Sequence, residues 1–249
     1  MYVYDLTFRF RVDPLEYELE FITYLSLLSG NNQTIYESMN VAGTDQIRVV
    51  RVCVPYKDSM EEKYYDAHTR EAYDRLKVHL SEPIGVRFVG WDCSFSDECS
   101  TGAEAEDYVL RIHPYLRDLS PICCGHCGGH IPYYLLPTLS EETTKELTAW
   151  EVNYAAYDRL FTVSEIGEMS AHKMLSSVKS PLNQKGLAVC RLLEAELNKP
   201  VYYYLYRFYG KQPRKCPICG GDWKVDAGSR FDYQCEHCKI VANKTVDEY

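Results

Sequence analysis

Cys216-Pro-Ile-Cys219-Gly220 and Cys235-Glu-His-Cys238 are two Cys-x-x-Cys pairs near the end of the chain, with fifteen residues between them. Four thiolates at this spacing can close a tetrahedral Zn²⁺ site, because each pair occupies a tight turn and the intervening segment can form a hairpin. Gly220 follows the first pair, where the sharp turn of the backbone favours glycine. The stretch predicts a zinc ribbon; the alternative is four unrelated buried cysteines.

A closed four-cysteine site leaves no coordination position for a substrate, so the predicted metal is structural and not catalytic. The predicted ligands of one structural Zn²⁺ ion are Cys216, Cys219, Cys235 and Cys238.

The remaining composition is that of a globular protein. With 249 residues and 46% hydrophobic content, the chain can bury a sizeable core in one large or two modest domains. The beginning of the sequence has no basic leader with an apolar segment, and no run reaches the roughly eighteen apolar residues of a membrane span. We therefore expect a cytoplasmic protein without a membrane partner. The odd number of cysteines, 11, favours metal binding in a reducing compartment over a disulfide framework.

The net charge of −9 is unevenly distributed. Residues 1–140 carry 12 Lys and Arg against 21 Asp and Glu, whereas residues 200–249 carry 8 against 6. An extended phosphate-binding face in the first part of the chain would act against that negative field. The charge therefore favours a basic partner for the N-terminal half.

The first 118 residues alternate strand and helix patterns. Residues 2–11 and 84–91 read as strands, and residues 35–41 and 47–54 as a hairpin. Asp13 and Ser59 are placed to cap two helices, the first ending at Gly30. We expect the first helix to bury the face formed by Leu15, Leu19, Ile22 and Leu25. Residues 107–112 are an additional strand candidate beside these elements.

This order predicts an α+β protein with a ferredoxin-like N-terminal sandwich, a helical middle and a C-terminal zinc ribbon. Helices are predicted from Ser140 to about Phe161 and from Ser180 onward, with residues 162–179 irregular and residues 201–209 a strand. The predicted divisions are an α+β domain (1–118), a cysteine knuckle linker (119–139), helices plus a tyrosine-rich strand (140–210) and the ribbon (211–249).

Cys124-Gly-His-Cys127-Gly128 has the form of half a zinc site. A two-ligand site binds Zn²⁺ poorly, so a second metal site needs partners. Those partners could be Cys93, Cys99, His113, His126 or His130, and the sequence does not choose among them. A turn without metal and a redox-active Cys-x-x-Cys are the alternatives. No hydrolase, phosphate-loop or zinc-protease motif is present, so we expect no enzyme and no catalytic residue.

Several stretches together resemble an uncharacterised bacterial family. They include Asp118-Leu-Ser-Pro121, the Cys124/Cys127 pair, Ile131-Pro-Tyr-Tyr-Leu-Leu-Pro137 and Phe231-Asp-Tyr-Gln-Cys235. Members of this family are described as zinc-ribbon-containing proteins with a suggested nucleic-acid-binding role. What the resemblance implies here is a bound Zn²⁺ ion and, through the ribbon, a nucleic-acid partner.

Three functions follow from these features. The first is non-enzymatic binding of a basic protein on the acidic N-terminal half, for example a toxin neutralised by an immunity-type protein. The second is nucleic-acid binding, with cations contacting phosphates and tyrosines stacking on bases. Its candidate contacts are Lys211, Arg214, Lys215, Lys224, Arg230, Tyr202, Tyr204 and Tyr206. The third is a cysteine- or metal-dependent enzyme at the central Cys123–Cys127 turn.

Overall fold

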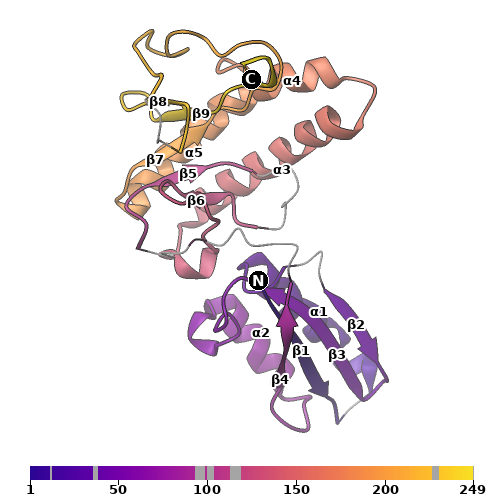
Figure 1. The fold of residues 1–249 in the computed structure, drawn as a ribbon. Helices are drawn as coiled ribbons and strands as arrows, with labels where there is room; N and C mark the ends of the chain where they lie inside the picture. Colours follow the sequence, from indigo (N-terminus) through magenta and orange to yellow (C-terminus); the bar gives the residue numbers. More distant parts are fainter. Residues whose placement is uncertain are drawn as a thin grey trace. The chain divides into compact units, whose positions relative to one another are not determined.

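The computed structural model describes residues 1–11, 13–35, 39–92, 99, 104–112, 119–225 and 230–248. The chain forms two compact units (Figure 1). The N-terminal unit contains residues 1–98 with the short segments 118–120 and 132–135, and the C-terminal unit contains the remainder. Each unit combines a sheet with helices, so the predicted α+β class is confirmed.

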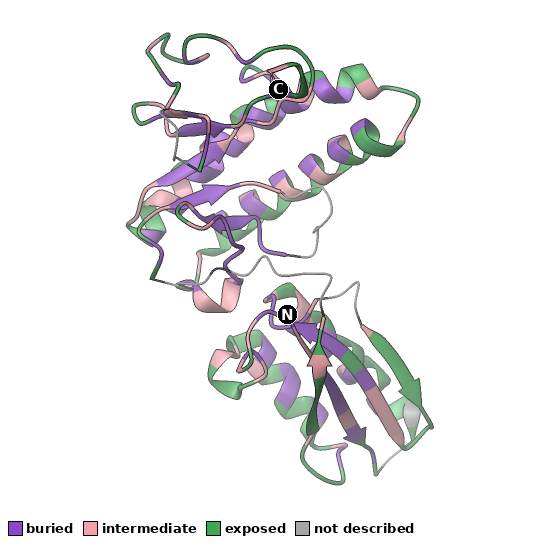
Figure 2. Ribbon diagram, viewed as in Figure 1, coloured by how far each residue is buried: buried purple, intermediate pink, exposed green. Residues whose placement is uncertain are grey.

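The N-terminal unit has a four-stranded sheet in the order β2-β3-β1-β4, and all neighbouring strands are antiparallel. Its strands are β1 (Tyr2–Arg9), β2 (Asn40–Gly43), β3 (Ile47–Val54) and β4 (Gly85–Trp91). The β2–β3 hairpin is where the sequence predicted it, although residues 36–38 lie outside the described part. The two outer strands are largely exposed, whereas β1 and β3 contribute to the core (Figure 2). The ferredoxin-like assignment stays a prediction.

Two helices cover one face of this sheet. They are α1 (Pro14–Gly30) and α2 (Ala67–Lys77), the latter preceded by the 3₁₀ turn η2 (Glu62–Tyr64). Asp13 caps α1 as predicted, because its side chain accepts a hydrogen bond from the backbone of Leu15. The predicted cap at Ser59 is wrong: Asp66 caps α2, and the buried Ser59 hydroxyl bonds the backbone of Tyr56.

The face that α1 buries differs from the predicted one. Its aromatic side contacts the sheet, with Phe10 stacked on Tyr17 and Phe8 edge-on to Phe21. Three of the four predicted core residues are instead exposed, and only Leu25 is buried; their exposed fractions are Leu15 95%, Leu19 74% and Ile22 51%. The helix carries apolar residues on two sides, and the larger aromatic side chains bury more area.

The C-terminal unit has a five-stranded mixed sheet in the order β6-β5-β7-β9-β8. Its strands are β5 (Tyr108–Leu110), β6 (Ile122–Cys124), β7 (Val201–Tyr204), β8 (Tyr233–Cys235) and β9 (Ile240–Ala242). The expectation that residues 107–112 extend the N-terminal sheet is wrong, because β5 pairs in parallel with β7. A parallel pair requires a long crossover, and the helices between β5 and β7 provide it.

Three helices form that crossover: α3 (Glu141–Val163), α4 (Glu168–Ser176) and α5 (Pro181–Leu197). The predicted helix starts at Ser140 and Ser180 are confirmed, and both serines are N-caps, but residues 162–179 are not irregular, since α4 lies within them. Tyr203 of β7 is buried against these helices, where its hydroxyl bonds Asn183 at 2.7 Å and its ring meets Trp150. The short 3₁₀ turn η5 (Val246–Glu248) also belongs to this unit, whereas η4 (Tyr133–Leu135) lies in the segment 132–135 of the N-terminal unit.

Candidate metal centres

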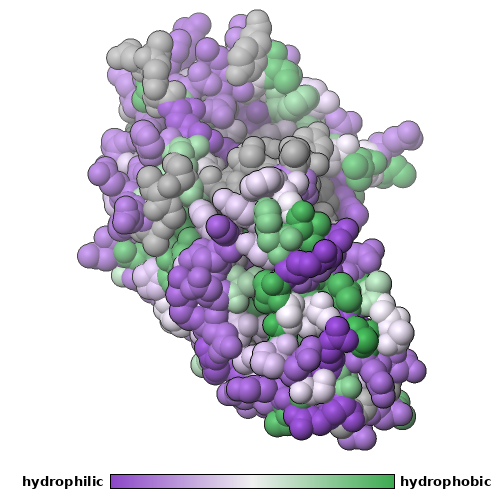
Figure 3. Space-filling view, turned by 60° about the horizontal axis from the view of Figure 1, so that its bottom comes forward, coloured by the Kyte–Doolittle hydropathy of each residue, from purple (hydrophilic) through white to green (hydrophobic). Residues whose placement is uncertain are grey.

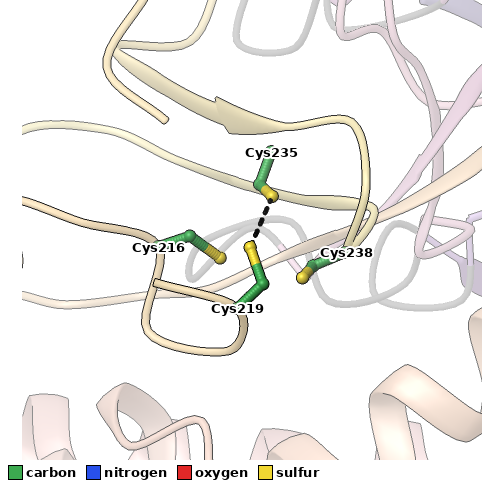
Figure 4. Close-up of side chains that lie close together, drawn as sticks. All are labelled: Cys216, Cys219, Cys235 and Cys238. Atoms are coloured by element: carbon green, nitrogen blue, oxygen red, sulfur yellow. Dashed lines mark hydrogen bonds between the residues drawn. The ribbon is translucent and has the colours of Figure 1, made fainter. Parts of the chain in front are cut away.

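The four ribbon cysteines lie together in the C-terminal unit. Their sulfur atoms are all within 4.8 Å of one another and point toward a common centre (Figure 4). The Sγ atoms of Cys219 and Cys235 are 3.7 Å apart. This is the donor set that a tetrahedral thiolate site needs, so the cluster could hold a metal ion.

Tight turns position each pair of thiols. The amide of Gly220 donates to the carbonyl of Cys216 at 2.9 Å, and its φ of 74° is in the left-handed region that glycine adopts at no steric cost. The second pair is followed by Lys239, which has a φ of 51° without being glycine. Lys239 places its ammonium group 4.8 Å from the centre of the Tyr202 ring, a cation–π contact. The side chain thus has a packing role that glycine could not supply.

The ribbon is built into the main sheet. Its hairpin of β8 and β9 pairs in parallel with β7, through Tyr203 opposite Ile240. Trp223 follows the first cysteine turn and is fully buried, donates to the carbonyl of Pro213 at 2.8 Å and packs on Tyr233. The cysteine turns therefore lie on a rigid apolar support, and that support includes the strand that follows α5.

The thiols of the ribbon differ in acidity. The backbone N–H of Gly221 lowers the pKa of the Cys219 thiol to about 7. Burial raises the pKa of Cys235 and of Cys238 above that of an ordinary thiol. Burying these two groups as charged thiolates costs free energy. A metal ion bound in a closed cysteine site would offset that cost through its positive charge.

A second cluster combines the Cys124–Cys127 turn with Cys99. The three sulfur atoms lie within 4.8 Å of one another, and the Cys127 and Cys99 sulfurs are 3.5 Å apart. Cys99 is held there by its amide, which donates to the carbonyl of His130 at 3.1 Å. Of the partners that the sequence left open, the structure selects Cys99. Cys93 and His113 lie outside the described residues.

The Cys124–Cys127 turn repeats the geometry of the first ribbon turn. The amide of Gly128 donates to the carbonyl of Cys124 at 2.8 Å, and Gly128 has a φ of 68°. The amide of Gly129 also approaches the Cys127 sulfur at 3.4 Å, a contact that stabilises a thiolate. This turn is therefore shaped as a metal knuckle. Of the histidines proposed as partners, His126 and His130 are not in the cluster, and Nδ1 of His130 lies 3.6 Å from the Cys123 sulfur.

Of the predicted nucleic-acid contacts, Tyr202 and Arg230 line one cavity, whereas the others lie on several segments of the unit. Tyr202 is buried with its hydroxyl on Glu236, Tyr204 is half-buried beside Phe231, and Tyr206 packs on Phe161 of α3. The predicted cations lie on several segments. Lys211, Arg214 and Lys224 are exposed, Lys215 pairs with Asp222, and Arg230 donates to the carbonyl of Cys127.

The sequence did not indicate a cavity of about 530 Å³ beside the central turn. Its lining comes from both cysteine-bearing parts of the unit. The lining residues are Asp107, Val109, Gly125, His126, Tyr202, Arg230, Phe231, Gln234 and Val241. These positions are distant in the sequence and follow no motif, so only the strand order could have indicated them.

Comparisons with known proteins give families without an assigned function. Residues 103–206 match a family model described as "Domain of unknown function (DUF2310)", and residues 209–248 match one described as "Domain of unknown function (DUF8594)". An uncharacterized protein of Haemophilus influenzae is 29% identical over 205 residues, covering 78% of this chain and 76% of the relative. Another from the same organism is 28% identical over 166 residues, covering 64% and 81%. The predicted resemblance to an uncharacterised family agrees with these matches.

None of the helices in the described part of the chain combines the length and the apolar character needed to cross a bilayer.

Proposed function

We propose that the protein is a non-enzymatic, zinc-stabilised binding protein that docks a basic protein on its acidic N-terminal unit. The observation that carries this proposal is the exposed aliphatic stripe of α1. The stripe consists of Leu15, Leu19 and Ile22. Their spacing of four and three residues places them on one side of the helix.

The stripe is separate from the side of α1 that builds the core. Tyr17, Phe21 and Tyr24 are at most 2% exposed and pack against the sheet and α2. Folding of the unit therefore buries the aromatic side of α1 and leaves the aliphatic stripe exposed to solvent. Contiguous exposed apolar residues of this kind are typical of interaction sites. In the space-filling view, apolar side chains reach the surface in separate patches among hydrophilic ones (Figure 3).

Acidic side chains border the stripe. Glu16 and Glu18 are both exposed and fall on its two sides by helical periodicity. An apolar centre with a charged rim is the usual arrangement of a protein interface. The negative rim and the acidic N-terminal half complement a positively charged partner, which would associate faster through electrostatic attraction. A basic toxin bound by an immunity-type protein is one partner of this chemistry.

We assign zinc to the ribbon cluster on the chemistry of its donors. Thiolates are soft ligands, and four of them in a tetrahedral arrangement suit Zn²⁺ or an iron–sulfur centre. The closed set of four, on a hairpin support, favours a structural ion. The cluster of Cys99, Cys124 and Cys127 is the candidate for a second Zn²⁺ ion. For the N-terminal unit we propose the ferredoxin-like fold, on its β-α-β-β-α-β order.

Nucleic-acid binding receives less support from the arrangement of the side chains. Base stacking needs an exposed ring face, and Tyr202 is only 6% exposed. Tyr204 and Tyr206 contact different parts of the unit, so they present no common surface. Binding of nucleic acid stays a prediction, and the experiment below separates it from binding of a protein.

The test is an affinity capture from the host cell with the tagged full chain, treated with nuclease. Leu19→Lys adds a positive charge to the centre of the stripe and should abolish capture of a basic protein. Because Leu19 is largely exposed, the change should alter the free energy of unfolding by no more than about 0.5 kcal/mol.

Leu160→Lys is the matched control, since Leu160 of α3 is also an exposed helical leucine, at 44%, and lies in the other unit. This variant should capture the same protein as the unsubstituted chain. Equal capture by the Leu19→Lys chain would rule out docking on α1. Capture of nucleic acid alone, with binding that weakens as the salt concentration rises, would instead support nucleic-acid binding by the C-terminal unit.

A further inference from the structure

The cavity of the C-terminal unit lies on the face of the sheet opposite to the helices. Tyr203 of β7 points into the helical layer, so the neighbouring Tyr202 points to the other face. Val109 is in register with Tyr202, and Val241 pairs with Gln234 of β8. Adjacent strands thus supply an apolar floor, while charged and polar side chains supply the rim.

Two oppositely charged side chains of the rim rest against the Cys124–Gly128 turn. A Cβ atom on Gly125 would lie 2.1 Å from a carboxylate oxygen of Asp107, so this carboxylate rests against one glycine of the turn. A Cβ atom on Gly128 would overlap the guanidinium group of Arg230, which therefore rests against the other glycine. Both glycines permit a close approach that any side chain would block.

Neither side chain forms an ion pair within the described residues, although His126 beside Asp107 interacts favourably with its carboxylate. Arg230 donates to the carbonyl of Cys127 and forms no ion pair there with a carboxylate. Asp107 likewise forms no ion pair in that part of the chain. Its burial, followed by the charges of Glu106 and Glu236, raises its pKa above that of an ordinary aspartate. A half-buried carboxylate without a counter-ion, in a cavity, is a candidate binding group.

The floor indicates what kind of molecule fits. Tyr202 and Phe231 are only 6% and 4% exposed, so they offer little ring surface for stacking a nucleobase. Recognition in this cavity must come mainly from the polar rim. A ligand that carries a positive group for Asp107 and a negative group for Arg230 would satisfy both sides at once.

We propose that this cavity binds a small zwitterion of the amino acid class, with its ammonium group on Asp107 and its carboxylate on Arg230. The apolar floor would contact the carbon chain between the two charged groups. The site is independent of the docking surface on α1, because all of its lining belongs to the C-terminal unit.

Calorimetric titration of the full, zinc-loaded chain tests this at low ionic strength. The probes are glycine, β-alanine, 4-aminobutyrate and 6-aminohexanoate, which differ in the number of methylene groups between their two charges. Butylamine and butyrate, with one charge each, are the comparison compounds. We expect one amino acid length to bind at least about tenfold more tightly than either. Absence of binding by all four, or equal binding by the singly charged compounds, would overturn the proposal.

Asp107→Asn removes the carboxylate charge while keeping its shape, and should weaken binding of the best probe by at least about tenfold. Glu104→Gln is its control, because Glu104 is an exposed acid of the same segment outside the cavity. Arg230→Gln should weaken the probe that carries a carboxylate and leave butylamine unaffected, with the exposed Arg214→Gln as control.

Arg230 also holds the Cys127 carbonyl, so its variant can lose metal. The zinc content of each variant is therefore measured alongside its affinity. If the Arg230→Gln chain does not fold, the Asp107→Asn chain alone tests the proposal. Unchanged affinity in a folded Asp107→Asn chain would refute the assignment.

Discussion

Residues with left-handed backbones follow each of the three Cys-x-x-Cys turns. Gly128 and Gly220 occupy two of these positions and Lys239 the third. A non-glycine residue in this conformation is sterically disfavoured, and the contacts of Lys239 with Tyr202 and Glu236 compensate. The glycines were recognisable from the sequence, whereas the equivalent role of the lysine was not.

The folding of residues 211–249 should depend on metal binding by the ribbon cysteines. Cys235→Ser should release one Zn²⁺ ion and unfold residues 211–249, because metal binding at such sites contributes folding free energy. Zinc content and hydrogen exchange of the segment are the measurements. Cys190→Ser, at a buried cysteine of α5 outside both clusters, is the control and should keep its zinc. A Cys235→Ser chain with full zinc content would contradict the ligand assignment.

His172 leads to a second prediction, about pH. Its Nε2 atom accepts hydrogen bonds from the backbone amides of Phe208 and Tyr209, both at 3.2 Å, so the imidazole must be neutral. Burial, followed by the charge of Arg207, lowers the pKa of His172, and the charge of Glu168 opposes this shift. The unfolded chain therefore binds the proton more readily than the folded chain.

The stabilisation from neutral His172 is present above the unfolded pKa of about 6.5 and is lost as the pH falls toward the lower folded pKa. The free energy of unfolding of the zinc-loaded chain, measured from pH 8 to pH 5, should show this decline. Both ends of the range lie more than about one pH unit from the unfolded pKa. His172→Gln retains an acceptor without a titrating group, so the stability of the unsubstituted protein relative to this variant should fall as the pH falls. A pH-independent difference would contradict the assigned role.

Among the elements, α1 shows that the spacing of apolar residues can predict a helix without predicting which of its sides is buried. Its leucine and isoleucine spacing and its tyrosine and phenylalanine spacing are both helical, so both predict an amphipathic helix. Only the sheet decides which side of α1 is buried. Phe8 of β1 and Phe10, which directly follows β1, provide aromatic partners for the tyrosine and phenylalanine side. The sequence predicted the helix and its cap correctly but assigned the wrong side to the core.

The contact of α5 with β7 depends on Gly186. A Cβ atom there would lie 2.2 Å from the Tyr203 ring and 2.7 Å from Nε1 of Trp150. Gly186→Ala should therefore destabilise the C-terminal unit by about 1–3 kcal/mol through overpacking. This is the opposite of the gain of up to about 1 kcal/mol that Gly→Ala gives in a free helix.

Gly30, at the end of α1, has no atom within 4 Å of such a Cβ, so Gly30→Ala is the control and should be neutral or slightly stabilising. Denaturant unfolding of both variants measures the difference. A Gly186→Ala chain as stable as the Gly30→Ala chain would show that α5 can retreat from the sheet at no cost.

For the whole molecule, the division into two units places both candidate metal clusters in one of them. Both cysteine clusters belong to the C-terminal unit, whereas the core of the N-terminal unit is aromatic and aliphatic. Metal binding stabilises only the unit that binds it. The two units should therefore respond differently to a chelator.

Treatment of the full chain with EDTA should raise hydrogen exchange in β8, β9 and the Cys124–Cys127 turn, and leave β1 and β3 unchanged. EDTA saturated with zinc beforehand is the control for effects of the chelator itself. An equal increase in both units would show that their stabilities are coupled, contrary to this prediction.

The sequence by itself determined the grouping of the four C-terminal cysteines, most of the helices with the cap at Asp13, and the hairpin of the N-terminal unit. These features depend on short-range sterics and hydrogen bonds, which residue spacing encodes directly. Only the tertiary structure decided that β5 joins the C-terminal sheet, that Cys99 meets Cys124 and Cys127, and that Asp107 and Arg230 share a cavity. These are contacts between distant segments, and they follow from which strands pair and which side of a helix buries more area.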